Sequence, residues 1–236
     1  MPVPGPSWPV RVPALIVIGG GPHGVYYVRQ LRRAIEAGRL ATSAIRVIDR
    51  DPACAVAAHL GGIVRLETAP WADWLDRHLD HLDPEAQLVP YHWAPHLLVD
   101  WLARAAARAG ASVRRSGPGQ PFGLPLERDT RDGDRALSYA TWLCPPTCIE
   151  PAVCPHTRGP KHWSLAADLA SAGGAWDGAF VFRCLHLVYG VGSIPVAEAQ
   201  AARQRILSDA GGVRRYLVAT SSHCHALATA LEIAPA

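Results

Sequence analysis

The chain has 236 residues, of which 49% are apolar and 18% charged, a composition typical of one substantial globular core and not of a disordered or fibrous protein. A net charge of only +3 and scattered arginines, with Lys161 the only lysine, argue against a nucleic-acid partner. No apolar run approaches the length of a membrane span, and the proline-rich residues 1–13 lack the apolar core of a signal peptide, so we expect a cytoplasmic protein without a membrane partner.

The first informative stretch is a short apolar run that leads into glycines. Residues 14–18 are all apolar, the turn Gly-Gly-Gly-Pro-His-Gly follows, and residues 25–35 then place apolar side chains at helical spacing until Gly38 gives a stop signal. This order predicts a strand, a tight turn and a helix. A second apolar run at residues 44–48 predicts the next strand, which closes on an acid, Asp49.

The glycines of this turn have a spacing with a known mechanical meaning. Gly19, Gly21 and Gly24 fit the pattern G-x-G-x-x-G, in which the first glycine makes the turn and the second lets the backbone approach a pyrophosphate. The third lets the helix pack close to the strand, and an acid after the second strand, here Asp49, takes the ribose hydroxyls. We therefore predict a bound dinucleotide. The alternative is a glycine-rich turn in an ordinary α/β domain without a ligand.

Residues 16–24, together with Val-Ile-Asp at 47–49, resemble the amino-terminal motif of FAD/NAD(P)-binding flavoproteins, especially a bacterial group whose motif also reads Gly-Gly-Gly-Pro-x-Gly. The resemblance covers about the first fifty residues. It implies that the ADP half of FAD contacts the three spaced glycines through its pyrophosphate and Asp49 through its ribose. NAD(P) is the alternative cofactor, and Arg50 directly after the acid would suit a 2′-phosphate.

Further along the chain the pattern continues as alternating short strands and helices. We predict a brief strand at residues 63–66, helices at 71–82 and 94–109, and a strand at 111–115. Residues 116–135 contain four glycines and three prolines and show no apolar period, so we predict a surface linker there.

A second informative region is rich in cysteine and proline. Cys144, Cys148 and Cys154 lie within eleven residues, and their spacing matches no common zinc-finger or ferredoxin pattern. In a reducing compartment such cysteines favour a metal site, and thiolates suit zinc or an iron–sulfur cluster. The remaining ligand would be Cys184 or one residue of the run His223-Cys224-His225. Two alternatives stay open: a redox dithiol formed by Cys144 and Cys148, and cysteines that are small packing residues.

In the last third of the chain, the spacing of apolar residues and turn signals predicts three helices, at residues 163–172, 196–207 and 226–233. It also predicts strands at 180–188 and 216–219, and a turn at 189–195. The simplest architecture is a single Rossmann-like α/β domain over residues 1–236, with a doubly wound, mostly parallel sheet. Its amino-terminal half would span 12–115, a linker and Cys/His-rich insertion 116–175, and a carboxyl-terminal half 176–236.

Two functions from different classes follow from these features. The first is an FAD- or NAD(P)-dependent oxidoreductase that acts on a small-molecule substrate, in which the protein orients the cofactor. The second is a non-enzymatic module that binds a dinucleotide and a metal and reports redox or nucleotide state to a partner. The sequence identifies no protein partner, no substrate and no catalytic residue.

Overall fold

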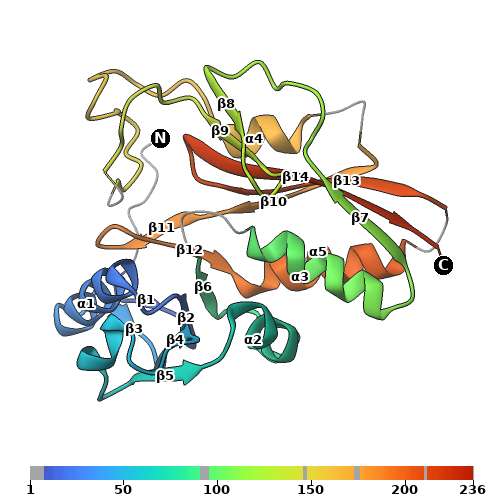
Figure 1. Ribbon diagram of the computed structural model, residues 1–236. Coiled ribbons are helices and arrows are strands. Elements are labelled where there is room, and N and C mark those ends of the chain that lie inside the picture. The colour runs from blue at the N-terminus through green and yellow to red at the C-terminus, as the bar shows by residue number, and fades with distance from the viewer. Residues whose placement is uncertain (1–7, 91–95, 146–147, 173–175, 210–211, 236) are drawn as a thin grey trace. The chain divides into compact units, whose positions relative to one another are not determined.

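The computed structural model describes residues 8–90, 96–145, 148–172, 176–209 and 212–235 (Figure 1). The chain divides into two compact units. Unit 1 comprises Met1–Tyr91 and Leu185–Ala197, and unit 2 comprises His92–Cys184 and Glu198–Ala236. Each unit is therefore built from two separate stretches of chain. Among the described residues, no helix has the length and apolar character that a membrane crossing requires.

Unit 1 contains a mixed six-stranded sheet in the order β11-β12-β6-β2-β4-β5. Strands β6, β2, β4 and β5 are parallel to one another, whereas β12 pairs antiparallel with both β6 and β11. A separate parallel pair joins β1 and β3. The strands are β1 (Val10–Arg11), β2 (Ala14–Ile18), β3 (Leu40–Ala41), β4 (Ala44–Asp49), β5 (Val64–Thr68), β6 (Gln87–Val89), β11 (Leu185–Val188) and β12 (Val191–Pro195).

Helices cover both faces of this sheet because its central strands are apolar on both sides. The helix α1 (Pro22–Glu36) packs its buried residues, among them Leu31, against Leu15 of β2 and Ile45 of β4. Ile16 and Ile48 alternate to the opposite face, and α2 (Trp71–His78) packs on β4 there. Two short 3₁₀ helices complete the unit, Ala55–His59 and Leu79–His81.

Unit 2 is organised around a mainly antiparallel sheet in the order β10-β13-β14-β9-β8, in which β7 also pairs with β14. The long strand β14 pairs along one edge with β13, and along the other edge first with β9 and then with β7. Only β10 and β13 form a parallel pair. The strands are β7 (Ser112–Ser116), β8 (Leu126–Asp129), β9 (Arg135–Ser138), β10 (Gly178–Arg183), β13 (Arg214–Ser221) and β14 (His225–Ala234).

Two helices lie on opposite faces of this second sheet (Figure 1). The helix α4 (Leu165–Ala170) packs Leu165 and Leu169 onto Leu217 and Ala219 of β13. The helix α3 (Leu97–Arg108) contacts β7, β13 and β14 on the other face. A third helix, α5 (Val196–Ser208), begins with the last two residues of unit 1 and continues into unit 2.

The predicted fold class, one doubly wound and mostly parallel Rossmann-like sheet, is wrong. The structure contains two separate six-stranded sheets, and antiparallel pairs form most of the second and part of the first. The first and last predicted strands, now β2 and β13, lie in different sheets. The physical reason is that β13 pairs with β10 and, in a hairpin, with β14, so of the strands in the last sixty residues only β11 and β12 join the sheet that contains β2.

Three local predictions also differ from the structure. Residues 226–233 lie in β14 and not in a helix, because every residue of this alanine-rich segment pairs with β13 and all but Thr229 also pair with β9 or β7, and this pairing overrides helix propensity. The predicted strand at 180–188 is two strands in different sheets, β10 and β11, and the predicted turn at 189–195 contains β12. The predicted linker at 116–135 contains β8 and leads into β9, while part of the predicted helix at 94–109 lies outside the described residues.

Candidate functional site

The glycine turn of unit 1 connects the end of β2 to the start of α1. Gly19 has a φ of 94°, in the left-handed region that favours glycine, and its amide N–H donates to the carbonyl of Ile48 at 2.9 Å. At Gly24, a Cβ atom would lie 2.1 Å from the carbonyl oxygen of Gly19, a distance at which atoms overlap. Gly24 therefore allows the first turn of α1 to pack directly on the turn that leaves β2.

The second spaced glycine faces open space. A Cβ atom at Gly21 would meet nothing within 4 Å, and its φ of −73° is open to any residue. Gly21 is the N-cap of α1 and supplies no side-chain cap, and the first helical turn contains no acidic residue. The positive end of the helix dipole is therefore not offset by a carboxylate in that turn.

Asp49 lies at the end of β4, beside the turn. One of its carboxylate oxygens accepts the amide N–H of Gly20 at 2.6 Å, and the other accepts the amide N–H of Asp51 at 2.9 Å. A carboxylate has about four acceptor positions, so these two bonds orient Asp49 and leave capacity for two more donors. The structure thus brings the four predicted dinucleotide residues, Gly19, Gly21, Gly24 and Asp49, to one end of the sheet in unit 1.

Gly20, which the sequence analysis did not single out, has a packing role in the structure. A Cβ atom at Gly20 would lie 2.3 Å from the sulfur of Cys54 and 3.3 Å from the Cβ of Asp49. The carbonyl of Gly20 also accepts the amide N–H of Val56 at 2.9 Å. Burial raises the pKa of the Cys54 thiol, and Asp49 adds to that shift, although backbone N–H groups oppose it. Cys54 is therefore a neutral packing group under the turn.

Because a side chain at position 20 would meet the sulfur of Cys54, the effects of substitutions at Gly20 and Cys54 on stability should be coupled. We expect Gly20→Ala to lower the free energy of unfolding by about 1–3 kcal/mol, because the new methyl group overlaps the Cys54 sulfur. In a Cys54→Ala background the same substitution should cost less, since the sulfur is gone. Urea unfolding of the two single variants and the double variant measures this coupling. Strictly additive effects would show that the sulfur does not constrain Gly20.

The predicted metal ligands are distributed over unit 2. Cys144, Cys148 and Cys154 lie in a segment that we call the cysteine loop, residues 139–145 and 148–163, and His223 and Cys224 lie in the turn between β13 and β14. The amide N–H of Tyr139 donates to the carbonyl of Cys224 at 3.0 Å, so the loop and this turn are joined. Cys184 follows β10, and His225 begins β14 with its Nδ1 2.9 Å from the Ser138 hydroxyl.

The surroundings of Cys144, Cys224 and Cys154 shift the pKa values of their thiols in different directions. Burial raises the pKa of Cys144, with further contributions from the neighbouring Cys148 and Cys224, and burial also raises the pKa of Cys224. A hydrogen bond from the backbone N–H group of Thr157 lowers the pKa of the Cys154 thiol.

The other predicted ligands are shifted mainly by desolvation. Burial raises the pKa of Cys184 to about 12 and lowers the pKa of both His223 and His225. Across the described part of the chain, no three His, Cys, Asp or Glu side chains are grouped so that they could hold a metal ion. All six cysteines are free thiols.

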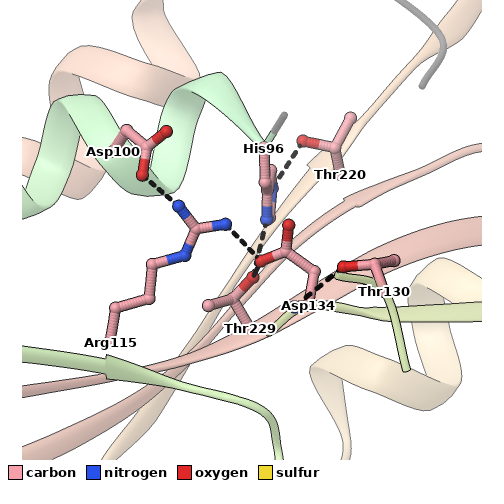
Figure 2. Close-up of polar contacts among 7 residues, drawn as sticks. All are labelled: His96, Asp100, Arg115, Thr130, Asp134, Thr220 and Thr229. Carbon is pink, nitrogen blue, oxygen red and sulfur yellow. Dashed lines mark hydrogen bonds and ion pairs between the residues drawn. The ribbon is translucent and has the colours of Figure 1, made fainter. Parts of the chain in front are cut away.

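A buried polar network that the sequence did not reveal lies between α3 and the sheet of unit 2 (Figure 2). His96 is 3% exposed, and its Nδ1 and Nε2 lie 3.0 Å from the hydroxyls of Thr229 and Thr220, respectively. The Thr229 hydroxyl donates to the carboxylate of Asp134, which is fully buried. Arg115 then bridges Asp134 and Asp100.

The direction of each hydrogen bond in this network follows from its charges. Asp134 is paired with Arg115 and accepts the only hydroxyl proton of Thr229, so Thr229 must accept from His96 Nδ1. Burial lowers the pKa of His96 to about 4, with Arg115 adding to that shift and Asp134 opposing it. The ring is therefore neutral at pH 7, protonated on Nδ1, and its Nε2 accepts from Thr220.

The network has a structural role. It joins the start of α3 to β7, β13 and β14 and to Asp134, which directly precedes β9. Its members are up to 133 positions apart along the chain, so no spacing in the sequence points to them. His96 directly precedes α3 and Asp134 directly precedes β9, so both lie just outside regular elements, where sequence patterns carry little information on burial.

The chain matches a protein-family model. A family model described as "Uncharacterized protein, C-terminal domain" matches residues 97–234, which is more than half of the chain and runs from the start of α3 to the end of β14. No curated protein and no solved structure matches the chain.

Proposed function

The chain belongs to the family described as "Uncharacterized protein, C-terminal domain", and on the geometry of its glycine turn we propose that it binds a dinucleotide, FAD in preference to NAD(P). The observation that supports this proposal is the contrast between two glycines. Packing requires a glycine at position 24, whereas at position 21 a Cβ atom would meet no atom of the described residues within 4 Å. A glycine at a position where the protein leaves space fits a site that a ligand approaches closely.

The residues around Gly21 fit the chemistry of a pyrophosphate and a ribose. The start of α1 offers the positive end of a helix without an acidic residue in its first turn, which suits a phosphate. Asp49 is oriented by two backbone N–H groups and retains acceptor positions for ribose hydroxyls. Gly19, Gly21 and Gly24 would thus hold the pyrophosphate region, and Asp49 the ribose.

With such a cofactor we propose an oxidoreductase that acts on a small molecule in the cytoplasm. A bound flavin or nicotinamide would supply hydride transfer, while the protein orients the cofactor and excludes competing reactions. The six free thiols fit a reducing compartment. Rapid oxidation of NADH or NADPH with a dye acceptor would support the enzyme, whereas dinucleotide binding without turnover would favour the non-enzymatic redox-reporting module.

We expect Gly21→Asp to abolish dinucleotide binding while it leaves the protein folded. The new carboxylate has room in the folded chain but would occupy the place of a pyrophosphate and repel it. The measurement is the visible spectrum of purified protein, followed by chromatography of the nucleotide released on heating and by titration with FAD, NAD+ and NADP+.

Two variants at the same position separate charge from size. Gly21→Asn has the shape of aspartate without its charge, and Gly21→Ala adds one methyl group to open space. Binding should weaken in the order Ala, Asn, Asp, with circular dichroism unchanged in all three. A wild-type protein that binds none of the three nucleotides, or a Gly21→Asp variant that binds as the wild type does, would refute the assignment.

A further inference from the structure

Unit 2 contains a small cavity beside α4. Its volume is about 250 Å³, and its lining comes from three separate places in the sequence. Leu165, Asp168 and Leu169 belong to α4, Phe122 and Leu124 precede β8, and Tyr139 directly follows β9. Sites for drug-sized ligands are larger, so this cavity suits one small molecule of about six to ten non-hydrogen atoms.

The wall of the cavity that precedes β8 is held by polar contacts. The carboxylate of Glu127 accepts the amide N–H of Phe122, at 2.9 and 3.1 Å, and that of Leu124 at 2.9 Å. Arg135 lies 3.7 Å from the same carboxylate and donates to the carbonyl of Gln120 at 2.8 Å. The wall is therefore formed before any ligand arrives, which lowers the entropic cost of binding.

The interior of the cavity is apolar, and two aromatic rings line it. Leu165 and Leu169 are buried members of the apolar cluster against which Phe122 and Tyr139 pack. The ring of Tyr139 also lies beside the indole of Trp163, with ring centroids 5.8 Å apart. Aromatic rings pack well on other rings and attract cations to their faces, so these walls suit a flat apolar group next to a positive charge.

A carboxylate without a basic partner lines the same cavity. Asp168 is exposed, and one of its oxygens accepts the Tyr139 hydroxyl at 2.7 Å. No basic side chain within the described ranges forms an ion pair with Asp168, whereas the carboxylate of Glu127 is paired with Arg135. A carboxylate has about four acceptor positions, so Asp168 can accept N–H groups from a ligand.

We propose that this cavity binds a small organic cation, a primary ammonium that carries a ring-sized apolar group. The N–H groups of the ammonium would donate to the carboxylate of Asp168, and the apolar group would contact the rings of Phe122 and Tyr139. The lining residues all belong to unit 2, so the proposal stands or falls independently of dinucleotide binding at the glycine turn of unit 1.

The test is titration of the full chain with benzylammonium chloride, followed by calorimetry and by the NMR shifts of backbone amides. We expect a dissociation constant of about 0.1–1 mM, which is reasonable for a ligand of this size. Benzyl alcohol has nearly the same shape without the charge, and it should bind about tenfold more weakly. Added NaCl should weaken the binding of benzylammonium and leave that of benzyl alcohol unchanged, because salt screens an exposed carboxylate.

Variants separate the contributions of the charge and the ring. Asp168→Asn keeps an acceptor for the Tyr139 hydroxyl but removes the charge, so benzylammonium should bind about tenfold more weakly. Tyr139→Leu removes a ring and should weaken binding about threefold to tenfold. Asp132→Asn removes an exposed carboxylate outside the cavity and should bind as the wild type does. Circular dichroism of each variant reports whether it is folded.

The comparison of the two ligands needs no variant and so does not depend on the folding of one. Equal affinities of wild-type protein for benzylammonium and benzyl alcohol would overturn the proposal, as would the absence of saturable binding or NMR shifts confined to residues outside the cavity. N-acetyllysine methylamide, a lysine side chain without a ring, should bind more weakly than benzylammonium. Tighter binding of this lysine analogue would overturn the choice of a free amine.

Discussion

Gly24→Ala should destabilise unit 1 more than any other single methyl group added to the glycine turn. The new Cβ would lie 2.1 Å from the carbonyl oxygen of Gly19 and 3.1 Å from its carbonyl carbon, so it meets backbone and not a side chain that can turn away. The first turn of α1 would have to move off β2. We expect a loss of about 3 kcal/mol in the free energy of unfolding, the upper end of the usual cost of overpacking.

The same displacement should abolish dinucleotide binding, because the start of α1 would no longer lie against the end of β2. Hydrogen exchange of the β2 and β4 amides and titration with FAD measure the two effects separately. Gly21→Ala is the matched control, since the same methyl group enters open space three positions earlier. Equal stability of the two variants would show that the contact between Gly24 and Gly19 does not constrain the turn.

The stability of unit 2 should fall as the pH is lowered from about 6.5 to about 4, because of His96. The unfolded chain binds a proton at this histidine below its ordinary pKa of 6.5, whereas the folded chain, in which burial lowers the pKa to about 4, does not. Between these values the unfolded state binds more protons, so acid favours unfolding, and the effect levels off below pH 4. The pKa difference corresponds to about 3 kcal/mol of stability.

A variant isolates this contribution from the carboxylates that titrate in the same range. His96→Gln keeps hydrogen-bonding capacity toward Thr220 and Thr229 but cannot take up the proton. The difference in unfolding free energy between wild type and variant should therefore change by about 3 kcal/mol between pH 7 and pH 4. His162→Gln, at an exposed position, controls for the loss of a histidine.

Burial sets the sign of the pKa shift of His96. Of the charged groups that act on the imidazole, Arg115 adds to this lowering and Asp134 opposes it, and the hydroxyls of Thr220 and Thr229 contact its two nitrogens. Urea unfolding across the pH range, followed by a probe in unit 2, provides the data. A difference between wild type and His96→Gln that does not depend on pH would contradict a neutral, buried imidazole.

Sequence patterns predicted the glycine turn well because its constraints are local. The strand at residues 14–18, the helix after the turn and the strand that ends at Asp49 all appear where the apolar periodicity places them. Gly19 and Gly24 are constrained by atoms within a few residues of the turn. The role of Gly20 escaped prediction because Cys54, the residue that fills its space, is thirty-four positions away.

Local pattern predicted strands at β7, β10 and β13 of the second sheet but not at β8, β9 and β14, and it could not predict how these strands pair, because the partners are distant in the sequence. The segment that forms β14 has the alanine and leucine content of a helix, and only its pairing with β13, β7 and β9 makes it a strand. The residues of β8 are mostly exposed and polar, so they lack the alternation that identifies a strand. The buried network around His96 has the same origin, since its members come from the start of α3, from β13 and β14 and from the residue before β9.

The return of the chain to unit 1 also has a consequence for how the protein is made. Strand β6 pairs with β2 on one side and with β12 on the other, and β12 belongs to a segment synthesised only after residues 92–184. At about 5–20 residues per second, a ribosome needs roughly 5–20 seconds for that interval. During this time the nascent chain presents β6 as an unpaired sheet edge, so a messenger truncated after residue 91 would encode a fragment prone to pair with other chains.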